Sequence, residues 1–385
     1  MKKISCTINF IFLCSYLLSA QHLINNAAIS FNVIGGYNFS SNNIDQAHAN
    51  KNLNKYYDNY SLDGVVNGFE IGVVKLVNGT KEWHKTWGMP RIGLHIQSIF
   101  MNKPDTFGYH ISLLPNIELR LITFPKSEIS SKVAIGVAYA SIGFNRLTNF
   151  DNRAVSSPIN FALEVAAVYH HRISNKLDLN LEAGYYHLSN GSFKMPNGGY
   201  NIYYSKLGLN YFFNQTPYEK RTIIQLSTAN KKMYYTGYLA FAYREQGTFD
   251  YQRQYPIFTF HNAIMKPLNK VYSLGIGLDF FYDATQALLY NYKLVPRGIN
   301  ESNKYLAAVG FCNELRIGKL ALPLEVYRYI YDLEVVKQAT YIRFGLTFYP
   351  IKRFYMGCYF KGSINKHNTL ESDFMEFAFG YNIRK

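Results

Sequence analysis

Apolar and polar residues alternate with a period of two along most of this chain. The alternation runs through segments of about ten to thirteen residues, separated by polar or glycine-rich turns. Clear examples are "AISFNVIGGYN", "GFEIGVVKLVN", "KLDLNLEAGYYHLS" and "TYIRFGLTFYP". A period of two gives each strand one apolar and one polar face, and strands of this length can cross a bilayer. The pattern therefore predicts an all-β fold, an antiparallel transmembrane β-barrel.

The connections between these segments alternate between short and long. The short ones fall at 172–176, 317–319 and 349–353, and the long ones at 39–66, 145–159, 283–303 and 364–372. In outer-membrane barrels the short turns face the periplasm and the long loops face outward. Counting back from the C-terminus gives about 16 strands (range 12–16) in a single barrel domain over 21–385. Residues 214–231 break the up-down order, and we interpret them as a long inner turn.

The N-terminus has the features of a secretory signal peptide. Lys2 and Lys3 precede the apolar run "INFIFLCSYLLSA", which ends in small residues before Gln21. This run is too short to span a membrane as a helix, and the pattern predicts a signal peptide over 1–20. We therefore expect the protein in the bacterial outer membrane.

The composition indicates many positions at a membrane–water boundary, and the net charge bears on the class of partner. The chain has 34 Tyr and 28 Phe but only 17% charged residues, which suits the two aromatic girdles of a membrane barrel. Removing Lys2 and Lys3 lowers the formal net charge from +15 to +13. A basic exterior favours phosphorylated lipid headgroups, although a lysine-rich proteome explains it equally well. Nucleic acid is not an expected partner, and a homodimer stays open.

The cysteines indicate neither a disulfide scaffold nor a metal site. Only Cys312 and Cys358 remain after the signal peptide, without CxxC spacing. They form either a single bridge or two small buried strand residues, and we favour the second. No metal-binding motif is found in the sequence, so no metal is assigned.

Candidate chemistry lies in "EAGYYHLSNGSFKMPNGGYN", residues 182–201. In the strand 177–189 the odd positions are mostly apolar, which places His187 and Ser189 at the end of the lipid-facing row and Glu182 in the lumen. Residues two apart lie about 6.6 Å from each other on one face, within reach of an imidazole–hydroxyl contact. Ser189 is the candidate nucleophile and His187 its general base.

The returning strand brings a third residue to the same face. Its apolar row is also odd-numbered, and a hairpin symmetric about residue 194 pairs Asn201 with His187. The Asn201 amide oxygen would then hold the imidazole N–H. A bulge at Gly198 and Gly199 would shift this register. In the plainer interpretation, the histidine and serine only bond to lipid headgroups.

The stretch "HLSNGSFKMPNGGYN" resembles the lipid A 3-O-deacylase family and related acyloxyacyl-hydrolase-like outer-membrane proteins. The shared pattern is His-x-Ser-Asn, then Pro-Asn, then Gly-x-Asn. The resemblance implies Ser189 as nucleophile, His187 as base, and Asn190 and Asn197 as supports for the oxyanion or the loop. The best-known members are eight-stranded barrels with a glutamate fourteen residues after the histidine, where this chain has Asn201.

That asparagine makes the motif similar to outer-membrane phospholipase A as well. "HLSNG" and an asparagine at this spacing both fit that family. The likeness implies that the Gly191 N–H helps to form the oxyanion hole and that calcium assists. The loop 192–200 differs, so no calcium ligands are carried over.

The sequence therefore predicts an outer-membrane serine esterase with a Ser189–His187–Asn201 triad on the lipid-facing wall. The first substrate choice is the 3-O-acyl ester of lipid A in lipopolysaccharide, cleaved without a cofactor. A calcium-dependent phospholipase A acting on outer-leaflet phospholipid is the first alternative. A non-enzymatic porin or transporter with a vestigial motif is the second.

Overall fold

The structure, a computed structural model, describes residues 26–39, 62–214, 232–245, 253–285, 304–331, 340–364 and 370–384. These residues form sixteen strands and two short helices, α3 (Glu82–Thr86) and α4 (Pro104–Phe107), which confirms the predicted strand number. The predicted signal peptide and nearly all of the predicted inner turn, 215–231, lie outside the described residues. Within the described residues, no helix has both the length and the apolar character needed to cross a membrane.

The first eight strands close into one antiparallel barrel, in which β1 pairs with β8. They are β1 (Ala27–Asn38), β2 (Gly64–Leu76), β3 (Arg91–Phe100), β4 (Tyr109–Thr123), β5 (Ser127–Ala140), β6 (Ile159–Arg172), β7 (Leu177–Ser189) and β8 (Tyr200–Phe212).

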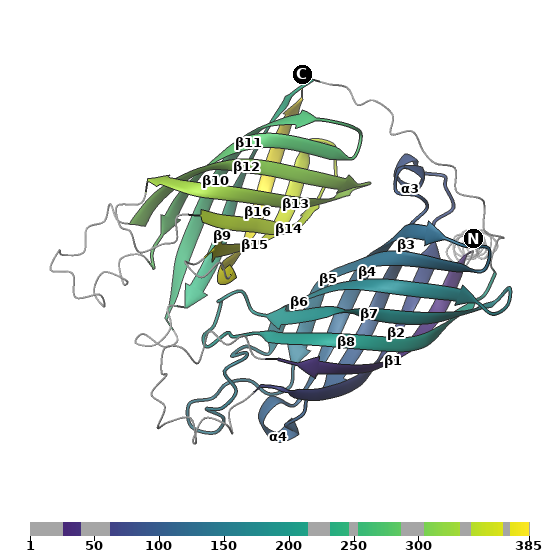
Figure 1. Ribbon diagram of the computed structural model, residues 1–385. Helices are drawn as coiled ribbons and strands as arrows, with labels where there is room; N and C mark the ends of the chain where they lie inside the picture. Colours follow the sequence, from purple (N-terminus) through teal and green to yellow (C-terminus); the bar gives the residue numbers. More distant parts are fainter. Residues whose placement is uncertain are drawn as a thin grey trace, which may run out of the picture.

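The last eight strands close into a second barrel, in which β9 pairs with β16. They are β9 (Tyr234–Glu245), β10 (Gln254–Pro267), β11 (Tyr272–Asp283), β12 (Tyr305–Ile317), β13 (Leu320–Tyr331), β14 (Thr340–Phe348), β15 (Phe354–Ile364) and β16 (Leu370–Arg384). Figure 1 shows the two barrels side by side, the first in purple to teal and the second in green to yellow.

This division corrects our expectation of a single barrel over 21–385. Ala28 lies opposite Phe212, so the free edge of β8 is paired by β1 and is not available to β9. Alternation in the sequence reports which side chains face outward, but it does not report which strands pair. A sixteen-stranded barrel and two eight-stranded barrels therefore have the same hydrophobicity pattern.

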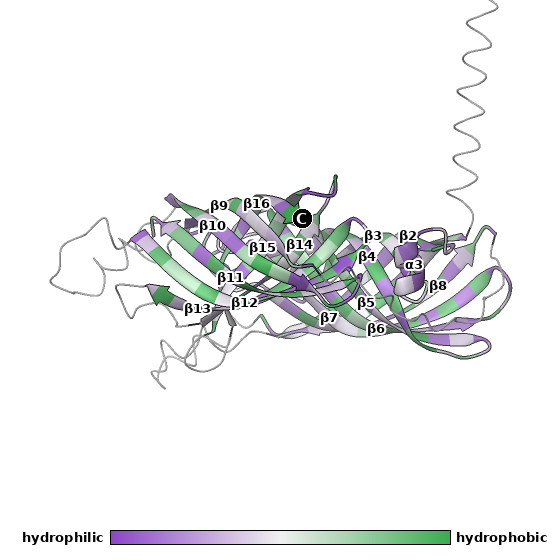
Figure 2. Ribbon diagram, turned by 90° about the horizontal axis from the view of Figure 1, so that it is seen from above, coloured by the Kyte–Doolittle hydropathy of each residue, from purple (hydrophilic) through white to green (hydrophobic). Residues whose placement is uncertain are grey.

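The predicted two-faced strands are present in both barrels. Along β8 most odd positions are exposed and apolar, with Tyr203, Leu207 and Leu209 at 60%, 55% and 44% exposure. The even positions Lys206 and Asn210 are buried. Figure 2 shows the same alternation of hydrophobic and hydrophilic positions along the strands. The outward faces match what a lipid environment requires.

Ion pairs fill the interior of the first barrel. The Lys206 Nζ lies 2.7 Å from Glu70 and 2.8 Å from Glu164, and the Lys132 Nζ lies 2.8 Å from Glu164 and 3.0 Å from Glu182. All five side chains are buried. An eight-stranded barrel is just wide enough for its own side chains. The interior is therefore a packed polar core.

The second barrel has an interior of the same kind. Three nitrogens of Arg343 reach three carboxylates, at 2.7 Å to Asp279, 3.0 Å to Glu325 and 2.8 Å to Glu376. Every one of these side chains is buried. The second barrel is therefore also held together by a compensated charge cluster.

The two cysteines are free thiols in this second barrel. Cys312 is buried and Cys358 is partly buried, and no disulfide joins them. The preferred interpretation of two small buried strand residues is confirmed for Cys312, whereas Cys358 lies on a strand but is only partly buried.

Replacing Lys206 with alanine is expected to destabilise the first barrel by about 3–5 kcal/mol, because Glu70 and Glu164 would lose a buried counter-charge. Urea unfolding of the detergent-solubilised protein measures this change. Lys176→Ala, at an exposed turn lysine, is the control and should change the free energy of unfolding little. A Lys206→Ala effect as small as the control effect would contradict the structural role.

Candidate active site

The candidate residues lie at the end of β7 and the start of β8. His187 pairs directly with Asn201 across this hairpin, so the predicted register is confirmed and no bulge shifts it. β7 ends before the loop 190–199, and β8 begins after it. The site therefore lies at the end of the first barrel that also carries the connections 39–63, 101–108 and 141–158.

A continuous chain of hydrogen bonds joins the three residues. The His187 Nε2 lies 3.1 Å from the Ser189 Oγ, and the His187 Nδ1 lies 2.8 Å from the Asn201 Oδ1. Because an amide oxygen only accepts, His187 carries its proton on Nδ1 and leaves the Nε2 lone pair facing the serine hydroxyl. Ser189 can then donate its proton to His187, which is the arrangement that nucleophilic catalysis needs.

Tyr185 adds a contact that the sequence did not single out. Its hydroxyl donates to the Asn201 Oδ1 at 2.6 Å, so this oxygen accepts from a phenol and an imidazole together. Tyr185 lies two residues before His187 on the same face, and this spacing is the signal that could have identified it. The second donor restricts the rotation of the amide.

The backbone of Asn201 is held by the end of β1. Its N–H donates to the Asn38 Oδ1 at 3.0 Å, and its carbonyl oxygen accepts from the Phe39 N–H at 2.9 Å. The Phe39 ring stacks on Tyr203 with centroids 4.8 Å apart. Asn38 lies 163 residues before Asn201 in the sequence. No local pattern reveals that contact.

Asn190 and Asn197 organise the loop that follows Ser189. The Asn190 N–H donates to the Asn197 Oδ1 at 2.9 Å, and the Asn190 Nδ2 donates to the Lys194 carbonyl at 2.8 Å. The backbone amide of Asn190 is therefore already engaged. The Asn197 Nδ2 is buried without a hydrogen-bond partner in the described part of the chain. Gly191 has φ +63°, a left-handed conformation that favours glycine.

Gly199 leaves room for the imidazole. Its φ is +73°, and a Cβ added there would lie 2.9 Å from the His187 Cε1. Its N–H donates to the Ala154 carbonyl at 2.8 Å, which fastens this segment to the connection between β5 and β6. A side chain at position 199 would therefore displace the histidine or strain the turn.

Glu182 does not lie in the site, as its even-numbered position on the strand predicted. It is buried in the lumen, where it accepts hydrogen bonds from Tyr204 at 2.6 Å and from Lys132. Ser189 and Asn201 face the other way, yet they are only 6% and 8% exposed. The loops and neighbouring side chains therefore leave a narrow approach to the hydroxyl.

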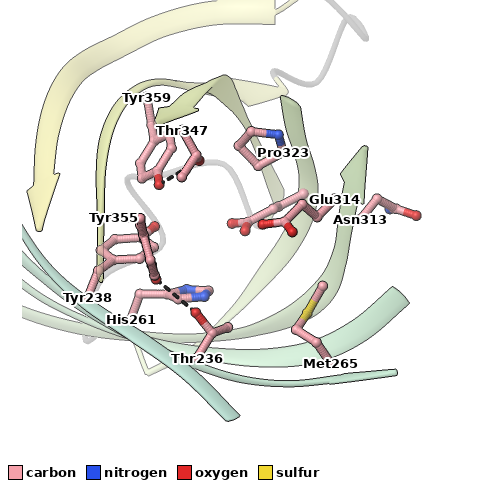
Figure 3. Close-up of a pocket in the computed structure, with 11 residues that line it drawn as sticks. Thr236, Tyr238, His261, Met265, Asn313, Glu314, Pro323, Thr347, Tyr355 and Tyr359 are labelled. Atoms are coloured by element: carbon pink, nitrogen blue, oxygen red, sulfur yellow. Dashed lines mark hydrogen bonds between the residues drawn. The ribbon is translucent and has the colours of Figure 1, made fainter. Parts of the chain in front are cut away.

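Within the described residues, one group could hold a metal ion by its donor types. The ligand atoms of His261, Cys312 and Glu325 lie within 4.8 Å of one another inside the second barrel. His261 and Glu325 also line a cavity of about 30 Å³, which Figure 3 shows with its surrounding side chains.

Each of these donors already has a protein partner. The His261 Nδ1 lies 2.7 Å from Asp279, Glu325 binds Arg343, and the Cys312 Sγ lies 3.1 Å from the Tyr327 hydroxyl. We therefore interpret the group as part of the structural charge network of this barrel.

Comparison with solved structures finds other β-barrels at low similarity. Neisserial surface protein A is 13% identical, with a TM-score of 0.30, over 49% of this chain and 97% of its own. The P. putida toluene transporter TodX is 8% identical, with a TM-score of 0.18, over 92% of this chain and 87% of its own. A mutant Rh. blastica porin is 8% identical, with a TM-score of 0.20, over 93% of this chain and 100% of its own. These TM-scores are too low to support any inference about function.

A comparison with curated proteins found no match. Two family models match, one to each barrel. The family described as "Lipid A 3-O-deacylase (PagL)" matches residues 67–210, which include β7, the loop 190–199 and most of β8. The family described as "Acyloxyacyl hydrolase, C-terminal domain" matches residues 231–385. Together with the barrel fold, these matches place the protein in the bacterial outer membrane, and the two barrels match related hydrolase families, the lipid A 3-O-deacylases for the first barrel and the acyloxyacyl hydrolases for the second.

Proposed function

We propose that this protein is a serine esterase that removes a 3-O-linked acyl chain from lipid A. The observation that carries the proposal is the hydrogen-bonded series Ser189–His187–Asn201 on the outward face of a barrel strand. All three residues lie within the segment that matches the deacylase family.

The chemistry follows from the tautomer of His187. The Ser189 oxygen attacks the ester carbonyl carbon while its proton moves to the His187 Nε2. The ester C–O bond then breaks, and His187 returns the proton to the departing sugar oxygen. Water, activated by the same nitrogen, cleaves the acyl-serine and releases a fatty acid. Asn201 keeps the imidazole oriented through both steps.

Two N–H groups are suited to stabilise the oxyanion. Within the described residues, the Gly191 N–H donates to no protein acceptor, and the Asn197 Nδ2 is buried without a partner. An unpaired buried donor beside a nucleophile is an arrangement that active sites use. The structure favours Asn190 as a loop support, because its N–H is bonded to Asn197.

The packed interiors of both barrels count against the porin alternative. Lys132, Lys206 and Arg343 are at most 2% exposed, and each is surrounded by carboxylates. The substrate would instead diffuse in the outer leaflet to the outer wall. Lipopolysaccharide reaches that wall without entering a lumen.

Phospholipase A activity is the second candidate, favoured by the asparagine at position 201. Calcium takes six to eight oxygen ligands. The carboxylate that contacts the loop 190–195 among the described residues is Glu245, through the Met195 N–H. We therefore propose an activity that needs no cofactor and continues in a chelator. Lysophospholipid formation that requires calcium would favour the phospholipase.

Ser189→Ala is expected to abolish the reaction, lowering the rate by at least about 10³-fold, because no other group supplies the nucleophile. Mass spectrometry of lipid A from outer membranes containing each protein measures it. Wild type should remove one hydroxyacyl chain, and the variant should leave lipid A intact. Unchanged lipid A and phospholipid with folded wild-type protein would contradict the esterase proposal.

Asn197→Asp is expected to lower kcat by about 10²–10³-fold, because it removes the Nδ2 donor and adds charge facing the oxyanion. The substitution keeps the oxygen that accepts the Asn190 N–H, so the loop should survive. Asn175→Asp, at an exposed turn, is a matched control and should retain activity. Equal kcat in Asn197→Asp and wild type would exclude Asn197 from the oxyanion hole.

Asn201→Ala is expected to lower kcat about 10–10²-fold through loss of imidazole orientation. Asn201→Asp keeps the acceptor and adds charge stabilisation of imidazolium, so it should match or exceed wild type. Steady-state kinetics on purified lipid A compares the two variants. Full activity in Asn201→Ala would show that Asn201 does not act through His187.

A further inference from the structure

The loop that follows Ser189 is clamped by the second barrel. The Glu245 N–H donates to the Ser192 carbonyl at 3.1 Å, and the Met195 N–H donates to the Glu245 Oε2 at 3.0 Å. Glu245 is the last residue of β9 and is 2% exposed. One buried residue of the second barrel therefore holds both ends of the segment 192–195.

Two further side chains of the second barrel reach the same loop. The Gln254 Nε2, at the start of β10, donates to the Phe193 carbonyl at 3.2 Å. Met375, on β16, packs so closely on Gly191 that an added Cβ would lie 2.9 Å from its own Cβ. The second barrel therefore contacts the loop at Gly191, whose N–H is the proposed oxyanion donor, and again at 192–195.

The contact extends down the wall beside the nucleophile. Phe161 is the register partner of Ser189 on β6, and its ring lies 6.4 Å from the ring of Phe377 on β16. At the opposite ends of the strands, the Trp87 Nε1 donates to the Arg316 carbonyl at 3.0 Å. The barrels thus touch at both ends, which limits rotation of one against the other (Figure 1).

The second barrel has no nucleophile motif of its own. Residues 232–385 contain no His-x-Ser sequence. Its interior is an engaged charge cluster around Arg343. A supporting role for the first barrel explains why the polar contacts of the second barrel include the loop of the candidate site.

We propose that Glu245 is a positioning residue, through which the second barrel fixes the 190–195 loop and aims the Gly191 N–H at the oxyanion. This inference rests on the proposed function for its catalytic consequence. The carboxylate touches no reacting atom, so its effect passes through the loop backbone. Loss of the clamp should therefore reduce kcat and leave KM nearly unchanged.

The test compares full-length Glu245→Ala and Glu245→Gln with wild type in detergent. Hydrogen exchange of the peptide spanning 190–195 reports the clamp, and kinetics on purified lipid A report its consequence. Glu245→Ala should speed exchange about tenfold and lower kcat about 10–10²-fold, because Met195 loses its acceptor. Glu245→Gln keeps an oxygen acceptor and should stay close to wild type in both readouts.

Two controls separate local from general effects. Lys352→Ala removes an exposed side chain at a turn elsewhere in the second barrel and should change neither readout. Gln254→Ala removes an exposed side chain and is expected to fold even if Glu245→Ala does not. It should speed exchange of the same peptide to a smaller extent.

Unchanged exchange in both Glu245→Ala and Gln254→Ala would overturn the clamp. Faster exchange with unchanged kcat would overturn the positioning role. A wild-type protein without activity on lipid A would instead overturn the proposed function, and the exchange comparison would still decide whether Glu245 holds the loop.

Discussion

The structure depends on the need to pair every backbone N–H and C=O inside the chain wherever strands face lipid. An open sheet edge in hydrocarbon leaves these groups without partners, so the strands must close on themselves. This chain meets the requirement twice, because β1 pairs with β8 and β9 pairs with β16. Each closure then sends alternate side chains outward and inward. That alternation places Ser189 and His187 on the wall where a lipid would arrive.

Most of the site could be predicted from that alternation alone. The odd positions along the two strands placed Ser189, His187 and Asn201 on one face, and the even position of Glu182 placed it on the other. The symmetry of the hairpin then paired Asn201 with His187. These are local relations within one hairpin, and the strand period determines them. The resemblance carried by the motif then added roles for Asn190, Gly191 and Asn197, which strand parity did not supply.

The division into two barrels could not be predicted in this way. It depends on pairing between β1 and β8, strands far apart in the sequence, and both arrangements satisfy the same outward-facing pattern. The contacts of Asn38 with Asn201 and of Glu245 with Met195 are hidden for the same reason. Each joins residues that only the closed fold brings together. Tyr185, in contrast, shares its strand with His187 and was accessible to the parity argument.

The proposed reaction requires Ser189 to be a nucleophile that His187 activates. Labelling of the folded full-length protein with a fluorophosphonate, followed by peptide mass spectrometry, tests this most directly. We expect modification at Ser189 in wild type and its loss in His187→Ala, with the barrel folded in both. Absence of label at Ser189 in folded wild type, or equal labelling without His187, would contradict it.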